Sequence, residues 1–221
     1  MPVLDPPIQA IADRLLAASE AQDAAMGPFF QRKAAAGELN FQSFDDETHR
    51  FLADKYVALE ADKAEFAYLV ARSLKARRIV EVGTSYGMST LYLAQAIRDN
   101  GGGTVIATEY EPAKAAQARA NFAEAGLAPF IDLREGDLRE TLKVIEGDVD
   151  FVLMDIWTEM ARTALERIHP HLRPGAVILT DNTAGSHIGY QDYFEFVRDP
   201  KNGLITNTLP FKGGLEFTVR A

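Results

Sequence analysis

The sequence predicts an α/β fold, a doubly wound sheet of seven strands that is mostly parallel, with a terminal antiparallel hairpin and N-terminal helices. Three observations carry this prediction. From Arg78 onward, apolar strand-like runs alternate with helix-like segments, which is typical of parallel strands joined by crossover helices. Residues 209–214 are too short for a crossover helix, so the strands on either side of them are expected to pair antiparallel. The first 60 residues show helical periodicity and no strand signal.

The N-terminal region is expected to be helical throughout. Residues 8–25 place apolar side chains at helical spacing, and Gly27-Pro28 is expected to stop this helix. Further helices are expected over about 45–59 and over 62–74, the last with Phe66, Leu69 and Val70 on one face. We therefore interpret residues 1–58 as a helical extension, either a lid or a dimer contact, and residues 59–221 as the main domain.

Strands and helices alternate through the rest of the chain. The predicted strands are residues 78–83, 104–109, 131–135, 150–155, 176–181, 204–208 and 215–220. The predicted helices between them cover residues 89–97, 111–125, 160–169 and 190–198. This pattern favours a Rossmann-like sheet with helices on both faces.

Composition narrows the classes of function. The chain has 221 residues and a net charge of −9, which suits one domain and argues against a nucleic-acid partner. It has no cysteine, which excludes disulfides, thiolate catalysis and cysteine-ligated metals. No run of 18 apolar residues occurs and the N-terminus lacks the pattern of a signal peptide, so we expect a cytoplasmic protein without a membrane segment.

The most informative segment is residues 79–90, IVEVGTSYGMST. A buried strand carrying Glu81 runs into a turn with Gly83, Ser85 and Gly87, and a helix starts near Ser89. The spacing E-x-G-x-S-x-G differs from the dinucleotide pattern G-x-G-x-x-G, and an acid before the turn suits a ligand with a positive charge or an amine. The segment resembles motif I of class I S-adenosylmethionine (SAM) methyltransferases. An ordinary strand–helix turn is the alternative.

Two further strand ends carry candidate cofactor contacts. Glu109 closes the second predicted strand, 26 residues after Gly83, where an acid accepts hydrogen bonds from ribose hydroxyls. Gly136, Asp137 and Leu138 follow the third strand, where folds of this class contact the adenine. A plain turn is the alternative there.

Two acidic strand ends predict a cation site. Asp155 closes the fourth strand, and Asp181 and Asn182 close the fifth. The carboxyl ends of neighbouring parallel strands meet at one edge of a sheet, so these side chains are expected to converge. Two carboxylates and an amide oxygen are hard ligands that suit Mg²⁺, Mn²⁺ or Ca²⁺. The other interpretation is that Asp181-Asn182 caps a turn.

From Leu59 to the C-terminus the chain resembles the catechol and caffeoyl-coenzyme A type of SAM-dependent O-methyltransferase, family 3. The resemblance is carried by LEADKAEFAYLVARSLKARRIVEVGTSYGMST, VLMDIWTEM, VILTDNT and GGLEFTV. It implies that Glu81, Gly83 and Ser89 line the methionine part of SAM and that Glu109 holds the ribose. It further implies that Asp137 and Leu138 flank the adenine, that Trp157 packs beside it, and that Asp155, Asp181 and Asn182 match the family's divalent-metal ligands.

One position departs from the family pattern. Many relatives carry a lysine directly after the tryptophan, where it serves as general base; here that residue is Thr158. A metal-bound phenol ionises more readily even without a lysine. His187, in a glycine-bearing loop, and Lys212, in the last hairpin, are the alternative bases at the same edge. The predicted catalytic residues are therefore Asp155, His187 and Lys212.

These residues together predict a SAM-dependent, divalent-metal-assisted O-methyltransferase. Its expected substrate is a small hydroxylated, catechol-like aromatic molecule, and a homodimer is one option for its assembly. Thr158 leaves two alternatives open: an acceptor that is not a phenol, and a SAM-binding protein with reduced or no catalysis. An NAD(P)-dependent oxidoreductase is disfavoured because the dinucleotide spacing and a Tyr-x-x-x-Lys pair are both missing from the sequence.

Overall fold

Seven strands form one sheet in the computed structural model, which describes residues 3–41, 43–184 and 189–221. The strands are β1 (Arg78–Val82), β2 (Thr104–Glu109), β3 (Ile131–Glu135), β4 (Val149–Met154), β5 (Leu172–Asp181), β6 (Leu204–Leu209) and β7 (Leu215–Arg220). Their order is β3-β2-β1-β4-β5-β7-β6, in which β7 pairs antiparallel with both β5 and β6 and the other pairs are parallel. The predicted sheet and its terminal hairpin are confirmed.

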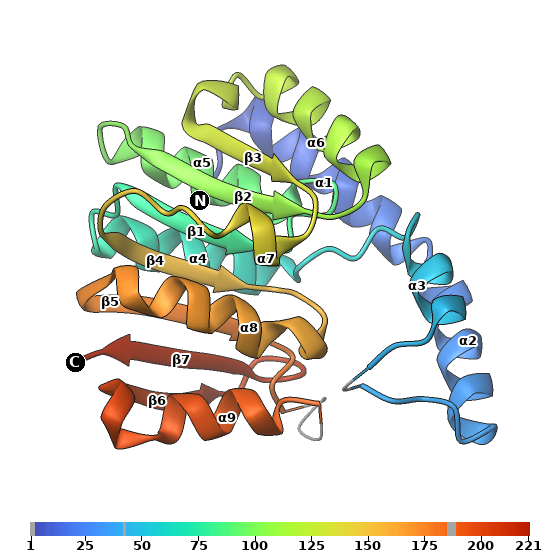
Figure 1. Ribbon diagram of the computed structural model, residues 1–221. Helices are drawn as coiled ribbons and strands as arrows, with labels where there is room; N and C mark the ends of the chain where they lie inside the picture. The colour runs from blue at the N-terminus through green and yellow to red at the C-terminus, as the bar shows by residue number, and fades with distance from the viewer. Residues whose placement is uncertain (1–2, 42, 185–188) are drawn as a thin grey trace.

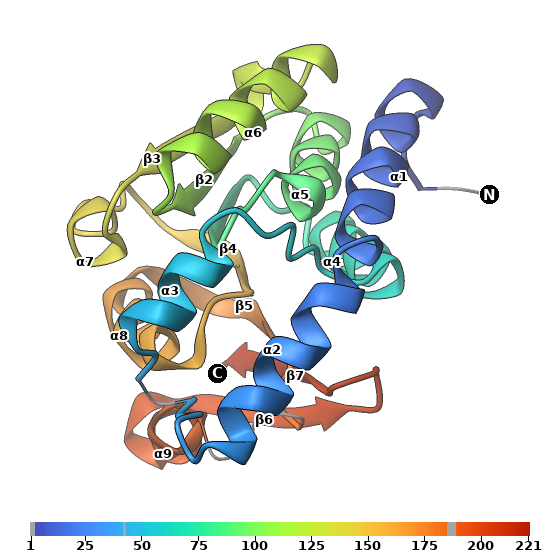
Figure 2. The ribbon, with the colours of Figure 1, turned by 90° about the vertical axis from the view of Figure 1, so that its right-hand side faces the viewer.

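Helices cover both faces of the sheet. One face packs against α1 (Pro6–Glu20), α4 (Ala61–Ser73), α5 (Met88–Asp99) and α6 (Pro112–Glu124). The other packs against α7 (Leu138–Thr141), α8 (Thr158–Ile168) and α9 (Gln191–Arg198). Figure 2 shows α1, α4 and α5 on one side of the sheet and α7 and α8 on the other. Short 3₁₀ turns lie at η1 (Ala128–Phe130), η2 (His169–His171) and η3 (Pro200–Asn202).

The strand alternation explains why the core has two halves. Along β1, Ile79 belongs to the cluster on the α4–α5 face, whereas Val80 and Val82 belong to the cluster on the α8–α9 face. Successive side chains of a strand point to opposite faces, so a strand buried on both sides is apolar almost throughout. Each such side chain contributes roughly 1.5–3 kcal/mol by leaving water. The same alternation places Glu81 on the Ile79 side, and its side chain is fully buried.

The helix boundaries in the N-terminal region differ from the prediction. The first helix ends at Glu20, and α2 (Asp23–Ala35) continues through Gly27-Pro28, so the predicted stop is wrong. Tertiary contacts carry α2 past the proline. The ring of Phe29 stacks on that of Phe51, with ring centroids 3.8 Å apart. The ammonium of Lys33 contacts the carboxylates of Glu38, Asp45 and Glu47.

Of the next two helices, α3 is shorter than expected and α4 differs in which residues of its buried face lie deepest. The helix expected over 45–59 is α3 (Asp46–Leu52), whose N-terminus Asp45 caps by accepting a hydrogen bond from the Thr48 amide at 2.9 Å. In α4, Phe66 and Val70 of the expected face pack against the core, but Leu69 is 54% exposed, and Ala64, Ala67 and Ala71 are the more deeply buried positions. Small side chains let α4 approach α5 closely.

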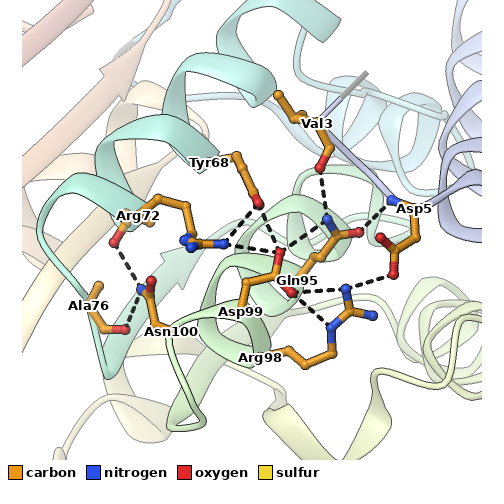
Figure 3. A network of polar contacts seen from close by, with 10 residues as sticks. Val3, Asp5, Tyr68, Arg72, Ala76, Gln95, Arg98, Asp99 and Asn100 are labelled. Atoms are coloured by element: carbon orange, nitrogen blue, oxygen red, sulfur yellow. Dashed lines mark hydrogen bonds and ion pairs between the residues drawn. The ribbon is translucent and has the colours of Figure 1, made fainter. Parts of the chain in front are cut away.

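The first helix is anchored to the main domain. Ile8, Ile11 and Leu15 are buried in the same cluster as the side chains of α4 and α5. A polar network reinforces this contact (Figure 3): Gln95 of α5 donates to the Val3 carbonyl at 2.8 Å and accepts from the Asp5 amide at 2.9 Å. The independence of residues 1–58 as a separate extension stays a prediction.

No helix in the described ranges is long and apolar enough to cross a membrane. The carboxyl ends of β2, β3 and β4 point toward the side of the molecule where α2 and α3 lie (Figure 1). The candidate site lies at that edge of the sheet.

Candidate active site

A pocket lies over the turn that follows β1. The turn contributes Gly83, Thr84, Ser85 and the start of α5, and Asp155 contributes from the end of β4. The opposite wall comes from the N-terminal region, with Leu15 and residues 56–59. Tyr56 of that wall stacks on Tyr86 of the turn, with ring centroids 3.7 Å apart. The covering wall therefore rests directly on the turn.

The glycines of this turn are explained by their backbone angles and by packing. Gly83 and Gly87 have φ of +95° and +93°, a region that side chains with a Cβ rarely adopt. A Cβ at Gly83 would overlap the carbonyl oxygen of Asp155, and one at Gly87 would overlap the ring of Phe122. The glycines thus let β4 and α6 approach the turn, a packing reason in addition to the expected one of ligand approach.

Glu81 lies beneath the turn with three hydroxyl donors around its carboxylate. Ser89 donates to Oε1 at 2.7 Å, and Thr84 and Thr90 donate to Oε2 at 3.0 and 2.5 Å. Burial raises the pKa of Glu81 from 4.5 to about 7, although these hydrogen bonds oppose the shift. The site therefore holds a buried acid whose ionised form needs a positive partner.

Ser85 carries the feature that most directly suggests a ligand. Its φ is 50°, and its hydroxyl oxygen is buried without a hydrogen-bond partner among the described residues. Its amide donates to Glu109 Oε2 at 2.7 Å, while Oε1 of Glu109 accepts from the Glu111 amide at 2.8 Å. Burial raises the pKa of Glu109. A buried hydroxyl next to an acid at a strand end fits the hydroxyl-rich ribose and methionine parts of SAM.

The predicted adenine contacts lie after β3. Gly136 has φ of +117°, and its amide donates to the Glu109 carbonyl at 2.9 Å, which joins this turn to the end of β2. Asp137 caps α7 and pairs with Arg139, whose hydrogen bond lowers the pKa of Asp137. Leu138 is buried. Trp157 directly precedes α8, with its ring centroid 5.4 Å from that of Phe44.

Asp155 and Asp181 lie close together at the ends of β4 and β5. Burial raises the pKa of Asp155 well above its usual range, and the charge of Asp181 adds to this shift. Asp181 is 2% exposed, and burial also raises its pKa. The hydroxyl of Tyr190 donates to the Asp181 carbonyl at 3.0 Å. The two carboxylates that the sequence predicts at this edge are therefore neighbours.

A lysine that the sequence interpretation did not single out binds Asp181. Lys63, in the first turn of α4, is 1% exposed, and its Nζ lies 2.5 Å from Asp181 Oδ1 and 2.8 Å from Glu60 Oε2. Burial alone would lower the pKa of Lys63, but the hydrogen bonds to the two acids raise it. One signal was available in the sequence: Lys63 precedes Ala67 and Ala71 at intervals of four residues, on the buried face of the helix.

Asn182 and the last hairpin complete the edge. Asn182, with φ of 58°, turns its Nδ2 toward Asp181 Oδ2 at 2.8 Å. A Cβ at Gly213 would lie 2.6 Å from Asn182 Oδ1, so the β6–β7 turn reaches this edge. Lys212 in that turn is exposed. His187 lies outside the described residues.

These side chains do not fit a divalent cation as they are arranged. Both oxygens of the Asp181 carboxylate accept hydrogen bonds from the protein, one from Lys63 and one from Asn182. Asn182 directs its amide nitrogen, which cannot ligate a metal, toward Asp181. A cation at this edge would share Asp181 with an ammonium that lies 2.5 Å from Oδ1, and the two positive charges would repel each other.

Thr158 takes a structural role at the position where many relatives carry a lysine. It is buried at the start of α8, and its hydroxyl donates to the Phe41 carbonyl. Nearby, the Phe44 amide donates to Glu159 Oε2 at 2.9 Å. The segment between α2 and α3 is therefore tied to the start of α8, beside the site.

The comparisons with known proteins follow the same residues. A model of a methyltransferase domain matches residues 80–183. The chain is 34% identical over 127 residues to a catechol O-methyltransferase of Mycobacterium tuberculosis, a match that covers 57% of each chain. It is 32% identical over 134 residues to the catechol O-methyltransferase of Niastella koreensis, covering 57% of this chain and 58% of the relative. The matches thus span less than two thirds of these relatives.

Solved structures resemble nearly the whole chain. Cofactor-bound Rv0187 from MTB superimposes with a TM-score of 0.72 at 26% identity, over 99% of this chain and 91% of the other. An O-methyltransferase from Bacillus cereus in complex with SAH gives 0.68 at 21% identity, over 97% and 100% of the two chains. The fold of residues that precede the domain match, including the first helix, therefore recurs in these structures.

Proposed function

We propose that this chain, which resembles the class I SAM-dependent O-methyltransferases in sequence and fold, is an enzyme that methylates a hydroxyl of a small molecule. One observation carries the proposal. The turn after β1 brings Ser89, which donates to the buried carboxylate of Glu81, to one pocket with Asp155 at the end of β4 and with Ser85, whose hydroxyl has no partner among the described residues. Bound there, SAM supplies an electrophilic methyl group on a positively charged sulfur.

Residues in and around the pocket are proposed to bind different parts of SAM. Glu109 is suited to accept hydrogen bonds from the ribose hydroxyls, because it lies at the end of β2 with its position fixed by two backbone amides. Glu81, Ser85 and Ser89 line the methionine end, where the ionised form of Glu81 attracts an amine. Asp137, Leu138 and Trp157 frame the adenine end. Fixed partners at both ends orient the methyl carbon toward the β4–β5 edge, which is the main contribution an enzyme makes to this reaction.

The acceptor binds at the edge formed by Asp155 and Asp181. Catechol O-methyltransferases are among the relatives, so we propose a catechol-like acceptor for this chain. In the transfer, the acceptor hydroxyl loses its proton to solvent or a base, its oxygen bonds to the methyl carbon, and the carbon–sulfur bond breaks. Residues 56–59, which line the pocket, would limit the access of water to a bound SAM. A metal-assisted form of this reaction would require Asp181 to be released from Lys63.

The test is a pair of measurements on the whole chain. Calorimetry should show that wild type binds SAM and that Glu109→Gln binds it about tenfold or more weakly, because the variant loses charge-assisted hydrogen bonds. Mass spectrometry should then detect methylated product from a catechol panel. SAM binding without product from any phenol would redirect the proposal to a different acceptor, and no SAM binding would contradict it.

A second function is favoured by one observation. Thr158 is engaged with the Phe41 carbonyl instead of facing an acceptor, which would suit a protein that binds SAM without turnover. Tight SAM binding with no product from phenols, carboxylates or nucleosides would support this alternative.

A further inference from the structure

We propose that Lys63 supplies, from within the fold, the positive charge that Asp155 and Asp181 would otherwise take from a divalent cation, so that the site works without metal. The inference rests on the proposed function, because it concerns the charge at the edge where the acceptor binds. Its evidence is the contact of a buried ammonium with the carboxylate at the end of β5.

The geometry of Lys63 is that of a built ion site. Its Nζ contacts Asp181 Oδ1 at 2.5 Å and Glu60 Oε2 at 2.8 Å, and its side chain is fully removed from water. Charge-assisted hydrogen bonds of this length are the strong ones. The pair joins residues 118 positions apart, so α4 is tied to the edge of the sheet by this contact.

A divalent cation would have to disrupt this arrangement. Each oxygen of the Asp181 carboxylate already accepts a hydrogen bond, one from the Lys63 ammonium and one from the Asn182 amide, so a cation would have to share this carboxylate with the ammonium or displace it. Displacement would leave an ammonium buried beside a doubly charged ion, where their repulsion is weakly screened. The lysine and the metal therefore compete for one carboxylate.

The chain offers a matched control. Lys33 is also 1% exposed, and its Nζ contacts Glu38, Asp45 and Glu47 at 3.1, 2.5 and 2.9 Å. In the part of the chain that the structure describes, these acids are the one group of three whose ligand atoms converge, and they are exposed. Removing Lys33 thus frees acids in the N-terminal region without changing the β4–β5 edge.

The experiment is a Mn²⁺ titration followed by electron paramagnetic resonance on the whole protein. Wild type and Lys63→Arg are expected to bind no Mn²⁺ at the sheet edge up to about 1 mM, beyond the range of dedicated cation sites. Lys63→Met should bind Mn²⁺ at least about tenfold more tightly than wild type, and Asp181→Asn in the same background should abolish the gain. In the control background, adding Asp181→Asn to Lys33→Met should leave Mn²⁺ binding unchanged.

Other readouts separate this inference from the proposed function. SAM binding, measured calorimetrically in the same samples, should be present in wild type with and without EDTA. Wild-type binding of Mn²⁺ that Asp181→Asn removes would overturn the inference, whatever the SAM result. If Lys63→Met does not fold, the wild-type and Asp181→Asn titrations still decide, since only a metal site in wild type would distinguish them. Loss of SAM binding would overturn the proposed function and leave the metal result intact.

Discussion

Glu81→Gln is the substitution that tests the electrostatics of the site most directly. Glu81 is fully buried and its pKa is raised from 4.5 to about 7, chiefly by burial. A carboxylic acid whose pKa is higher in the folded than in the unfolded chain stabilises the fold fully below the lower value. That stability is lost as the pH rises from about 4.5 through about 7. Glutamine is uncharged at every pH and so does not incur this loss.

The size of the effect follows from the shift. Each pKa unit corresponds to 1.36 kcal/mol, so a rise from 4.5 to about 7 gives about 3 kcal/mol between pH 4.5 and pH 8. For a chain of 221 residues this is roughly 6–12 °C in melting temperature. The free energy of unfolding of Glu81→Gln minus that of wild type should therefore be about 3 kcal/mol higher at pH 8 than at pH 4.5.

The assay is urea denaturation of the SAM-free protein at the two pH values. Comparison with wild type cancels the titration of acids that Glu81 does not influence, whereas the pKa of Asp155, which the Glu81 charge raises, should fall slightly in the variant. Thr90→Val is the companion variant: the Thr90 hydroxyl donates to Glu81 Oε2 and lowers the pKa of Glu81, so its removal should enlarge the pH dependence. A Glu81→Gln difference that is equal at both pH values would refute the reasoning. The affinity of Glu81→Gln for SAM at pH 8 should also fall, because the ionised Glu81 carboxylate is the proposed partner of the SAM amine.

Three further substitutions test separate parts of the structure. Gly87→Ala should destabilise by about 1–3 kcal/mol in urea denaturation, because φ is +93° and the new methyl group meets the ring of Phe122. Ser85→Ala should weaken SAM binding up to about tenfold in calorimetry while unfolding stays unchanged, since its hydroxyl has no partner among the described residues. Ile11→Ala should lower the free energy of unfolding by about 2–5 kcal/mol within a single calorimetric transition. A separate low-temperature transition would instead support an independent N-terminal extension.

The sheet was predictable because its strands carry a local signal. Apolar runs that end in a glycine or an acid lie where buried parallel strands must lie, and all seven strands occur close to the predicted positions. The helices were less predictable where tertiary contacts decide. Pro28 should break a helix, yet the stacking of Phe29 on Phe51 holds α2 together across it. In α4 the larger apolar side chains suggested the buried face, yet Leu69 is exposed and the alanines are the deepest positions.

The candidate site divides in the same way. Glu81, Ser85 and Glu109 lie at strand ends and turns, and topology alone brings such positions to one edge. The partners of these side chains depend on residues distant in sequence. Lys63 is separated from Asp181 by 118 positions, and no periodicity encodes their pairing. The reason for Gly83 is also distant, since the carbonyl of Asp155 occupies the space that a Cβ would need.

The charge at the β4–β5 edge favours Lys63 over a metal on a further ground. SAM carries a positive sulfonium, which under the proposed function would lie near Asp155. Glu60 and Asp181 both contact the Lys63 ammonium, and Asp155 lies beside Asp181, so the acids at this edge outnumber the lysine. The remaining charge stays negative and attracts the sulfonium, whereas a divalent cation in addition to Lys63 would cancel it. Lys63 can therefore stabilise the buried carboxylate pair in the fold while the site still attracts a cationic cofactor.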